Sequence, residues 1–138
     1  EDPWALCKEL PEEYEIACAR YQPELMRSIL GFSTEEIARE CMAAGEVVLQ
    51  EHCVSKLGFE AAWENFESAD GAFAFCDSLF SGVAQSQCVT AAAKEFVFQE
   101  FPDWEEKSAT LCDTLSPTEQ AECFRVRQQT IEQYGRAL

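Results

Sequence analysis

The chain has 138 residues, which is enough for one domain with a modest core and too few for two ordinary domains. Its 26 acidic and 10 basic residues give a formal net charge of -16, so nucleic acids and anionic membranes would be repelled and are not expected as partners. A basic partner is compatible with this charge. No stretch approaches the roughly 18 uninterrupted apolar residues that a membrane span needs.

The chain begins with Glu1-Asp2-Pro3 and contains eight cysteines. A start without methionine is what a processed, secreted protein would show. No two cysteines have the Cys-x-x-Cys spacing of zinc and thioredoxin-like sites, and the chain has a single histidine. We therefore expect disulfides, and with them a secreted, extracellular protein or one from another oxidising compartment such as the periplasm.

The cysteines recur with a period of 35 residues, counted on the second member of each neighbouring pair (18, 53, 88, 123). The eight are Cys7, Cys18, Cys41, Cys53, Cys76, Cys88, Cys112 and Cys123. Four internal repeats explain this spacing, at about 1–32, 33–68, 69–102 and 103–138 within a single domain. In every repeat a proline or glycine lies between the two cysteines, which predicts that they stand on consecutive helices.

The first repeat predicts a short helix, a turn at Leu10-Pro11 and a longer helix. Pro23 lies within the longer segment and predicts either a kink or a late helix start after Tyr21-Gln22. In the second repeat Ser33-Thr34-Glu35-Glu36 has the pattern of a capping box, and Gly45 marks the turn.

The third repeat has its turn at Ser81-Gly82, and the fourth has it at Ser116-Pro117. Asp103 predicts the start of the last short helix, whereas Ser116 is placed to cap the last long one, with Pro117 at its first position and Glu119 at its third. Each repeat thus predicts a helix of about 8 to 12 residues followed by one of about 14 to 20.

Apolar residues recur at two further positions of the repeat, directly after the second cysteine and seven residues beyond that position. These residues are Ala19, Val54, Val89 and Phe124, then Met26, Ala61, Phe96 and Ile131. A spacing of seven keeps both positions on one helical face, so we expect them in the core. No segment alternates over enough residues to predict a strand. The expected fold class is all-α, with about eight helices in four antiparallel hairpins, arranged as a short right-handed solenoid or as a compact bundle.

Residues at similar distances on either side of a tight turn face each other, so we expect one disulfide within each hairpin. The pairs are Cys7–Cys18, Cys41–Cys53, Cys76–Cys88 and Cys112–Cys123. An alternative scheme joins neighbouring repeats through Cys18–Cys41, Cys53–Cys76 and Cys88–Cys112, and leaves Cys7 to pair with Cys123. Each hairpin disulfide would close a loop of about a dozen residues and stabilise the protein by roughly 3 kcal/mol.

In repeat length and helix-pair plan, the chain resembles the tetratricopeptide class of helical repeats. The resemblance covers architecture alone, because the Trp, Leu-Gly and Tyr pattern of that class is absent here at its spacings. No family is assigned on this basis.

The sequence offers no catalytic constellation. His52 stands beside Cys53, but a cysteine held in a disulfide is neither a nucleophile nor a metal ligand. Clustered glutamates fall in the first turns of the expected helices, where they suit the positive end of the helix dipole. We therefore expect a non-enzymatic protein with no cofactor and no metal; an enzyme that uses paired carboxylates is the alternative.

Aromatic side chains crowd into the middle third of the chain. Packing explains most of them, and the rest would line an apolar cavity or form an exposed binding patch. The candidate contacts for a ligand or partner are Phe73, Phe75, Phe80, Phe96, Phe98, Trp63 and Trp104. Phe96 and Phe98 are two residues apart on a helix and point to different sides, so either that helix is sandwiched or one ring is exposed.

These features favour a secreted, non-enzymatic binding module that recognises a protein or peptide partner on an acidic helical surface, which suits a basic partner. The alternative is a carrier of a small hydrophobic, lipid-like ligand held between helices of the Phe-rich middle repeats.

Overall fold

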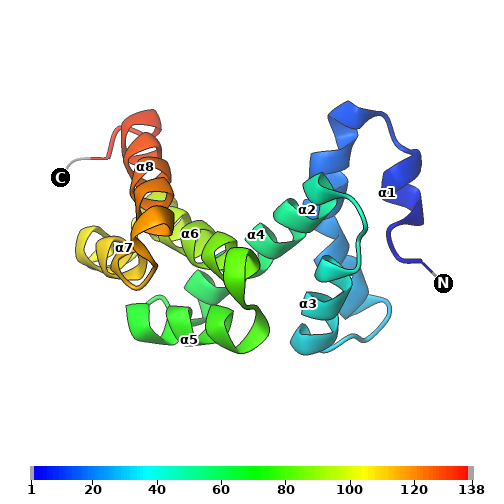
Figure 1. Cartoon of the computed structure of the whole chain (residues 1–138), viewed down its shortest axis with the longest axis horizontal. Coiled ribbons are helices and arrows are strands. Elements are labelled where there is room, and N and C mark those ends of the chain that lie inside the picture. The colour runs from blue at the N-terminus through cyan, green and yellow to red at the C-terminus, as the bar shows by residue number, and fades with distance from the viewer. Residues whose placement is uncertain (1, 137–138) are drawn as a thin grey trace. The chain divides into compact units, whose positions relative to one another are not determined.

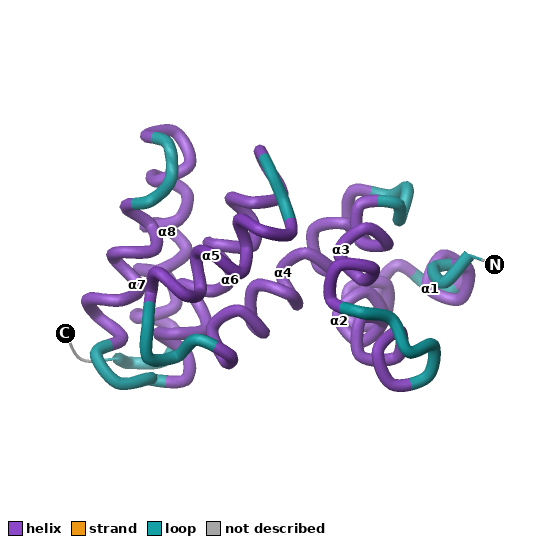
Figure 2. Tube along the Cα trace, turned by 90° about the horizontal axis from the view of Figure 1, so that it is seen from below, coloured by secondary structure: helices purple, strands orange, loops and turns teal. Residues whose placement is uncertain are grey.

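The computed structural model of the chain describes residues 2–136, and all regular secondary structure in this range is helical (Figure 1). Short and long helices alternate along it: α1 (Ala5–Glu9), α2 (Glu12–Ser28), α3 (Thr34–Met42), α4 (Val47–Glu64), α5 (Ala69–Leu79), α6 (Gly82–Gln99), α7 (Trp104–Asp113) and α8 (Pro117–Gln133). Short loops join consecutive helices (Figure 2). The predicted all-α class and its helical hairpins are confirmed.

A disulfide joins the two helices of each hairpin. The bonds are Cys7–Cys18, Cys41–Cys53, Cys76–Cys88 and Cys112–Cys123. Their Cα–Cα distances are 5.6, 5.3, 5.7 and 5.4 Å, in the usual range for disulfides. The predicted hairpin pairing is confirmed, and the alternative through Cys18–Cys41 is wrong, because the turns bring the two cysteines of one hairpin face to face.

The chain forms two compact units, residues 1–57 and 58–138. The boundary falls inside α4, between Leu57 and Gly58, rather than between two of the predicted repeats. The division into four repeats of a single domain stays a prediction.

In the first unit, α2 packs against both α1 and α3. Trp4 is buried just before α1, and its indole Nε1 donates to the carbonyl oxygen of Glu40 in α3 at 2.9 Å. The predicted capping box at the start of α3 is confirmed: the amide of Glu36 donates to Ser33 Oγ at 3.2 Å, and the amide of Ser33 donates to Glu36 Oε1 at 2.9 Å.

Pro23 lies inside α2, which continues without a break from Glu12 to Ser28. The predicted late start of this helix is therefore wrong. Proline has no N–H to donate to the carbonyl of Ala19, one turn earlier, so one helical hydrogen bond is missing there. Ala19 and Pro23 are both buried, which shows that packing holds the helix together at this point.

In the second unit, α6 packs against α5, α7 and α8. Much of its buried surface is small, since Ala84, Cys88, Ala91, Ala92 and Ala93 are all buried. Small residues let neighbouring helices approach closely, as the next contact shows.

Gly58, in α4, lies directly against α6. A Cβ added to Gly58 would stand 2.7 Å from the Cβ of Ala91 and would also collide with the carbonyl oxygen of Cys88. A glycine is therefore required at this crossing.

α7 and α8 start at the residues that the sequence predicts, but neither start has a side-chain capping hydrogen bond. Asp103 precedes α7 in the left-handed conformation (φ 58°), and its side chain makes no capping hydrogen bond. Ser116 precedes α8 with Pro117 at the first position, as predicted. Its hydroxyl donates to Glu119 Oε1 at 3.0 Å instead of accepting from a backbone amide, so Ser116 holds the predicted N-cap position without a side-chain capping hydrogen bond.

The predicted core positions are well supported. All four residues at the later position are buried: Met26, Ala61, Phe96 and Ile131. At the position directly after the second cysteine Ala19, Val54 and Val89 are buried, whereas Phe124 is half-buried.

Each hairpin has a pair of residues four positions before its first cysteine and four positions after its second, and this pair differs between the outer and the inner hairpins. In the first hairpin Gln22 Nε2 donates to the carbonyl oxygen of Pro3, and at the corresponding positions of the fourth Arg127 Nε donates to Ser108 Oγ at 2.7 Å. The equivalent pairs of the inner hairpins are buried and apolar: Ile37 with Leu57, and Ala72 with Ala92. These two repeat positions thus carry a hydrogen bond in the outer hairpins and buried apolar residues in the inner ones.

Candidate functional site

The seven predicted aromatic contacts are divided between the core and the surface of the second unit. Phe80, Phe96 and Trp104 are buried, and Phe73 and Phe75 are half-buried. Trp63 and Phe98 are exposed. They do not line one common cavity. A ligand site at the buried rings would require the helices around them to open.

Phe96 and Phe98 separate as their spacing predicts, with one ring buried and one exposed. Phe96 packs edge-on against Phe101, with ring centroids 5.5 Å apart. Phe98 stacks edge-to-face on Tyr134 at 4.8 Å. Arg136 then donates to the carbonyl oxygens of Val97 and Phe98, so the segment after α8 is bound to the end of α6.

Trp63 is exposed but held in place. Its ring packs edge-to-face on Phe101 at a centroid distance of 5.0 Å, and its Nε1 donates to Glu95 Oε2 at 2.8 Å. Phe66 lies 5.7 Å from the same Phe101 ring. This small aromatic surface belongs to the packing around the loop that contains Phe101.

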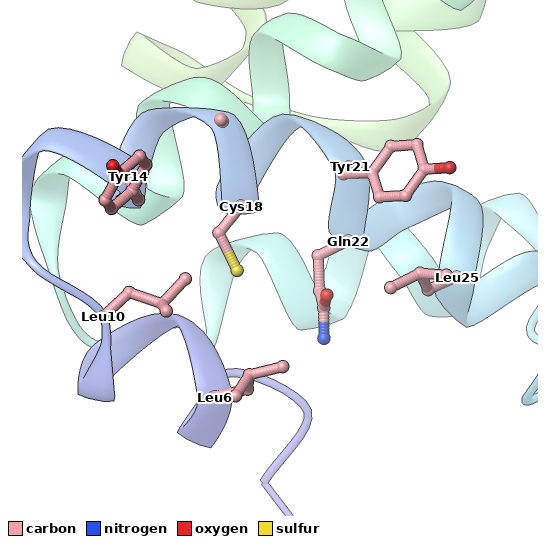
Figure 3. Close-up of a pocket in the computed structure, with 8 residues that line it drawn as sticks. Leu6, Leu10, Tyr14, Cys18, Tyr21, Gln22 and Leu25 are labelled. Atoms are coloured by element: carbon pink, nitrogen blue, oxygen red, sulfur yellow. The ribbon is translucent and has the colours of Figure 1, made fainter.

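An apolar cleft lies in the first unit, between α1 and α2, with a volume of about 570 Å³ (Figure 3). We call it the α1–α2 groove, and it is lined by Leu6, Leu10, Tyr14, Ala17, Cys18, Tyr21, Gln22 and Leu25. In Figure 3 the side chains of Leu6 and Leu10 rise from α1 toward Cys18 and Gln22, which point down from α2.

The spacing of its lining residues explains the groove. Tyr14, Cys18, Tyr21 and Leu25 follow one another at intervals of four, three and four residues, which places them on one face of α2. The core face of this helix is different and carries Ala19, Pro23 and Met26. α2 therefore has two apolar faces, one packed and one open.

The open face exposes large apolar and aromatic side chains to solvent. Leu6, Tyr14 and Tyr21 have exposed fractions of 62%, 55% and 65%. Contiguous exposed apolar surface on a folded domain commonly marks an interaction site. Little of the lining is polar: it consists of the Gln22 amide, whose Nε2 donates to the carbonyl oxygen of Pro3, and the two tyrosine hydroxyls.

The walls of the groove are linked covalently. The Cys7–Cys18 disulfide joins α1 to α2, and Cys18 itself lines the groove. Trp4 anchors the start of α1 on the other side, through its hydrogen bond to Glu40. The groove is thus built before any partner arrives.

Carboxylates border the groove. Glu9, Glu13 and Glu24 are exposed and stand next in sequence to the lining residues Leu10, Tyr14 and Leu25. Between Ala5 and Ser28 there are five glutamates against three basic residues, Lys8, Arg20 and Arg27. The segment that forms the groove is therefore net acidic, although one of the bordering carboxylates, Glu24, pairs with Arg27 at 3.8 Å.

Glu15 of α2 and Glu46 form a pair of neighbouring carboxylates. The pKa of Glu15 is raised, first because its half-buried side chain is partly desolvated and then because Glu46 lies within hydrogen-bonding and repulsive range. Glu12 adds to the repulsion.

Sequence reasoning missed this groove because it looked for aromatic density, which is highest in the middle repeats. The available signal was the second apolar stripe on α2, at Tyr14, Tyr21 and Leu25, beside the stripe that contains Ala19 and Met26. A helix with two apolar stripes needs two coverings, and α1, with only five residues, is too short to cover one of them.

Other kinds of site are not found in the described range. His52 lies half-buried on α4 beside the Cys41–Cys53 disulfide. Within residues 2–136 no three histidine, cysteine or carboxylate side chains stand close enough to share a metal ion. None of the helices described there is long and apolar enough to cross a membrane. No protein-family model, curated protein or solved structure matches this chain.

Proposed function

We propose that the protein is a secreted, non-enzymatic binding module that holds a protein or peptide partner in the α1–α2 groove. The observation that carries this proposal is the groove itself, an apolar cleft in which Leu6, Tyr14 and Tyr21 are more than half exposed. Tyrosine suits such a surface, because it provides a large contact area with few rotatable bonds and keeps a polar tip.

The rigidity of the groove supports binding. A helix of five residues is too short to be stable alone, yet α1 is held by the Cys7–Cys18 disulfide and by Trp4. A partner would therefore lose little affinity to ordering of the site. Four disulfides also fit an oxidising, extracellular compartment.

Selection from a random peptide display library, with the oxidised protein as bait, tests this function. We expect enriched peptides whose affinity falls by roughly tenfold or more in Tyr21→Ser, since central aromatic residues dominate interfaces. Ile16→Ser is the matched control, because Ile16 is exposed on the same helix outside the groove. Enriched peptides that bind both variants equally well, or no enrichment at all, would contradict the proposal.

The second candidate is a carrier of a small apolar ligand. Its support is the volume of the groove, about 570 Å³, within the range of roughly 300 to 1,000 Å³ typical of small-molecule pockets. The site would then lie in the first hairpin rather than in the middle repeats. Native mass spectrometry after expression in lipid-rich medium checks this: a carrier should retain a lipid mass that Leu25→Glu loses, and a bare protein mass speaks against it.

A further inference from the structure

α2 and α6 occupy the same place in their hairpins, since each is the long helix that carries the second cysteine of its disulfide. Counted from that cysteine, Tyr14 of α2 corresponds to Ala84 of α6, and Tyr21 corresponds to Ala91. The groove face of α2 therefore has an equivalent face on α6.

On α6 this face is covered by a helix. Gly58 of α4 lies against Cys88 and Ala91, so closely that a Cβ at Gly58 would come within 2.7 Å of the Ala91 Cβ. Ala91, at this contact, is accordingly only 6% exposed, and Ala84 on the same face of α6 is 7% exposed. The face is thus one on which this hairpin fold receives a helix.

On α2 the same face is open, and it is lined by larger residues. Tyr14 and Tyr21 replace the two alanines, and both are more than half exposed. The stripe from Tyr14 to Leu25 spans twelve residues, or about 16 Å of helix axis, which matches three turns of a partner helix. Leu6 and Leu10 form the opposite wall, so a helix laid in the groove would contact apolar side chains on both sides.

We infer that the occupant of the α1–α2 groove is an amphipathic helix of a partner protein, apolar along one face and basic along its edges. The inference rests on the proposed function and names the chemistry of its partner. The exposed carboxylates of Glu9, Glu13 and Glu24 border the groove and complement basic side chains. A second copy of this chain is disfavoured, because two molecules of net charge -16 repel each other.

Four synthetic peptides of about 15 residues, a length at which an isolated helix is only marginally stable, test the inference against the full oxidised protein. The first has leucines at helical spacing and lysines at the edges of that face. The second carries glutamates in place of the lysines, the third has two central prolines, and the fourth scrambles the first. Affinity is measured by isothermal titration calorimetry and helicity by circular dichroism.

We expect the first peptide to bind with a gain in helicity, and each of the other three to bind at least roughly tenfold more weakly, since charge, helix and apolar face all contribute. Tyr21→Ser should weaken the first peptide by roughly tenfold or more, and Ile16→Ser should leave its affinity within about twofold.

Each departure from this pattern overturns a defined part of the inference. Equal binding of the proline peptide excludes a helical occupant, and equal binding of the glutamate peptide excludes a basic one. Equal binding of the scrambled peptide shows that the acidic surface rather than the groove is responsible, and equal loss of affinity in Tyr21→Ser and Ile16→Ser shows that the peptide does not bind specifically in the groove. If no peptide binds, the helix inference fails, whereas the binding function is judged separately by the library selection.

Discussion

At the residue scale, Gly58 shows how one missing side chain determines a helix crossing. In isolation, Gly→Ala inside a helix would stabilise it by roughly 1 kcal/mol. At Gly58 the added methyl meets the backbone of α6 at Cys88 as well as Ala91, and a backbone carbonyl cannot turn away as a flexible side chain can.

We therefore expect Gly58→Ala to destabilise the second unit by about 1 to 3 kcal/mol, the usual cost of overpacking. Thermal unfolding followed by circular dichroism, under oxidising conditions, measures this. An unchanged or higher Tm would show that α4 and α6 separate easily, and that the glycine is not required for their contact.

Glu15 gives a prediction with a defined pH dependence. Its pKa is raised in the folded protein, so the ionised form is disfavoured by folding, and stability increases as pH falls from above the folded pKa to below the unfolded one. Glu15→Gln, which is neutral throughout, should raise Tm at pH 7 and lose this advantage once the pH is below the ordinary glutamate pKa of about 4.3.

The matched control is Glu13→Gln, an exposed carboxylate on the same helix. It removes the same charge without touching the contact between Glu15 and Glu46. If Tm at pH 7 rises equally in the two variants, the stabilisation comes from the smaller net charge of the protein, and the contact between Glu15 and Glu46 does not contribute to it.

At the scale of elements, α1 depends on its disulfide more than any other helix, because it has only five residues. Cys7–Cys18 and Cys112–Cys123 enclose loops of equal length, with a sequence separation of 11 in both. Replacing either pair by serines should therefore cost a similar amount, roughly 3 kcal/mol on the chain-entropy model.

The two serine variants should differ in function. Loss of Cys7–Cys18 releases one wall of the groove, so binding of a groove peptide should be lost and the amides of α1 should exchange rapidly with deuterium. Loss of Cys112–Cys123 should leave both properties unchanged as long as the protein stays folded. Retained peptide binding in the first variant would show that α1 needs no covalent tie.

Much of this local structure could be predicted from the sequence, because its causes are local. Turn residues such as Gly45 separate the helices, and Ser33 with Glu36 fixes the start of α3. Pro23 was harder, because burial beside Ala19 outweighs the lost hydrogen bond, and burial depends on tertiary packing. The place of the groove depends on packing in the same way: both apolar stripes of α2 can be read in the sequence, but nothing within α2 tells which of them, Tyr14–Tyr21 or Ala19–Met26, will be covered.

At the scale of the whole molecule, both units are acidic. Residues 1–57 carry 12 acidic and 5 basic side chains (net -7), and residues 58–138 carry 14 and 5 (net -9), which together give the -16 of the chain. The repeat period predicts hairpins but not the unit boundary at Gly58, because that boundary follows from contacts between helices far apart in sequence.

This charge predicts that salt acts in opposite directions on stability and on binding. Screening relieves the repulsion among the carboxylates, so Tm should rise as NaCl increases from roughly 0.02 to 0.3 M. Over the same range a basic helical peptide should bind more weakly, because its attraction to Glu13 and its neighbours is screened. Differential scanning fluorimetry and titration calorimetry provide the two measurements; a Tm that falls with salt would mean that favourable ion pairs outweigh the repulsion.

The position of the disulfides also has a consequence for how the protein is made. Every cysteine is bonded to the cysteine nearest to it in sequence, at a separation of 11 or 12 residues. The next candidate is about two to three times as far away along the chain. Short loops close at the lowest entropic cost, so the native partner is also the one that a growing chain meets first. During synthesis each hairpin can therefore be oxidised as it emerges, before the next pair of thiols exists to compete with it.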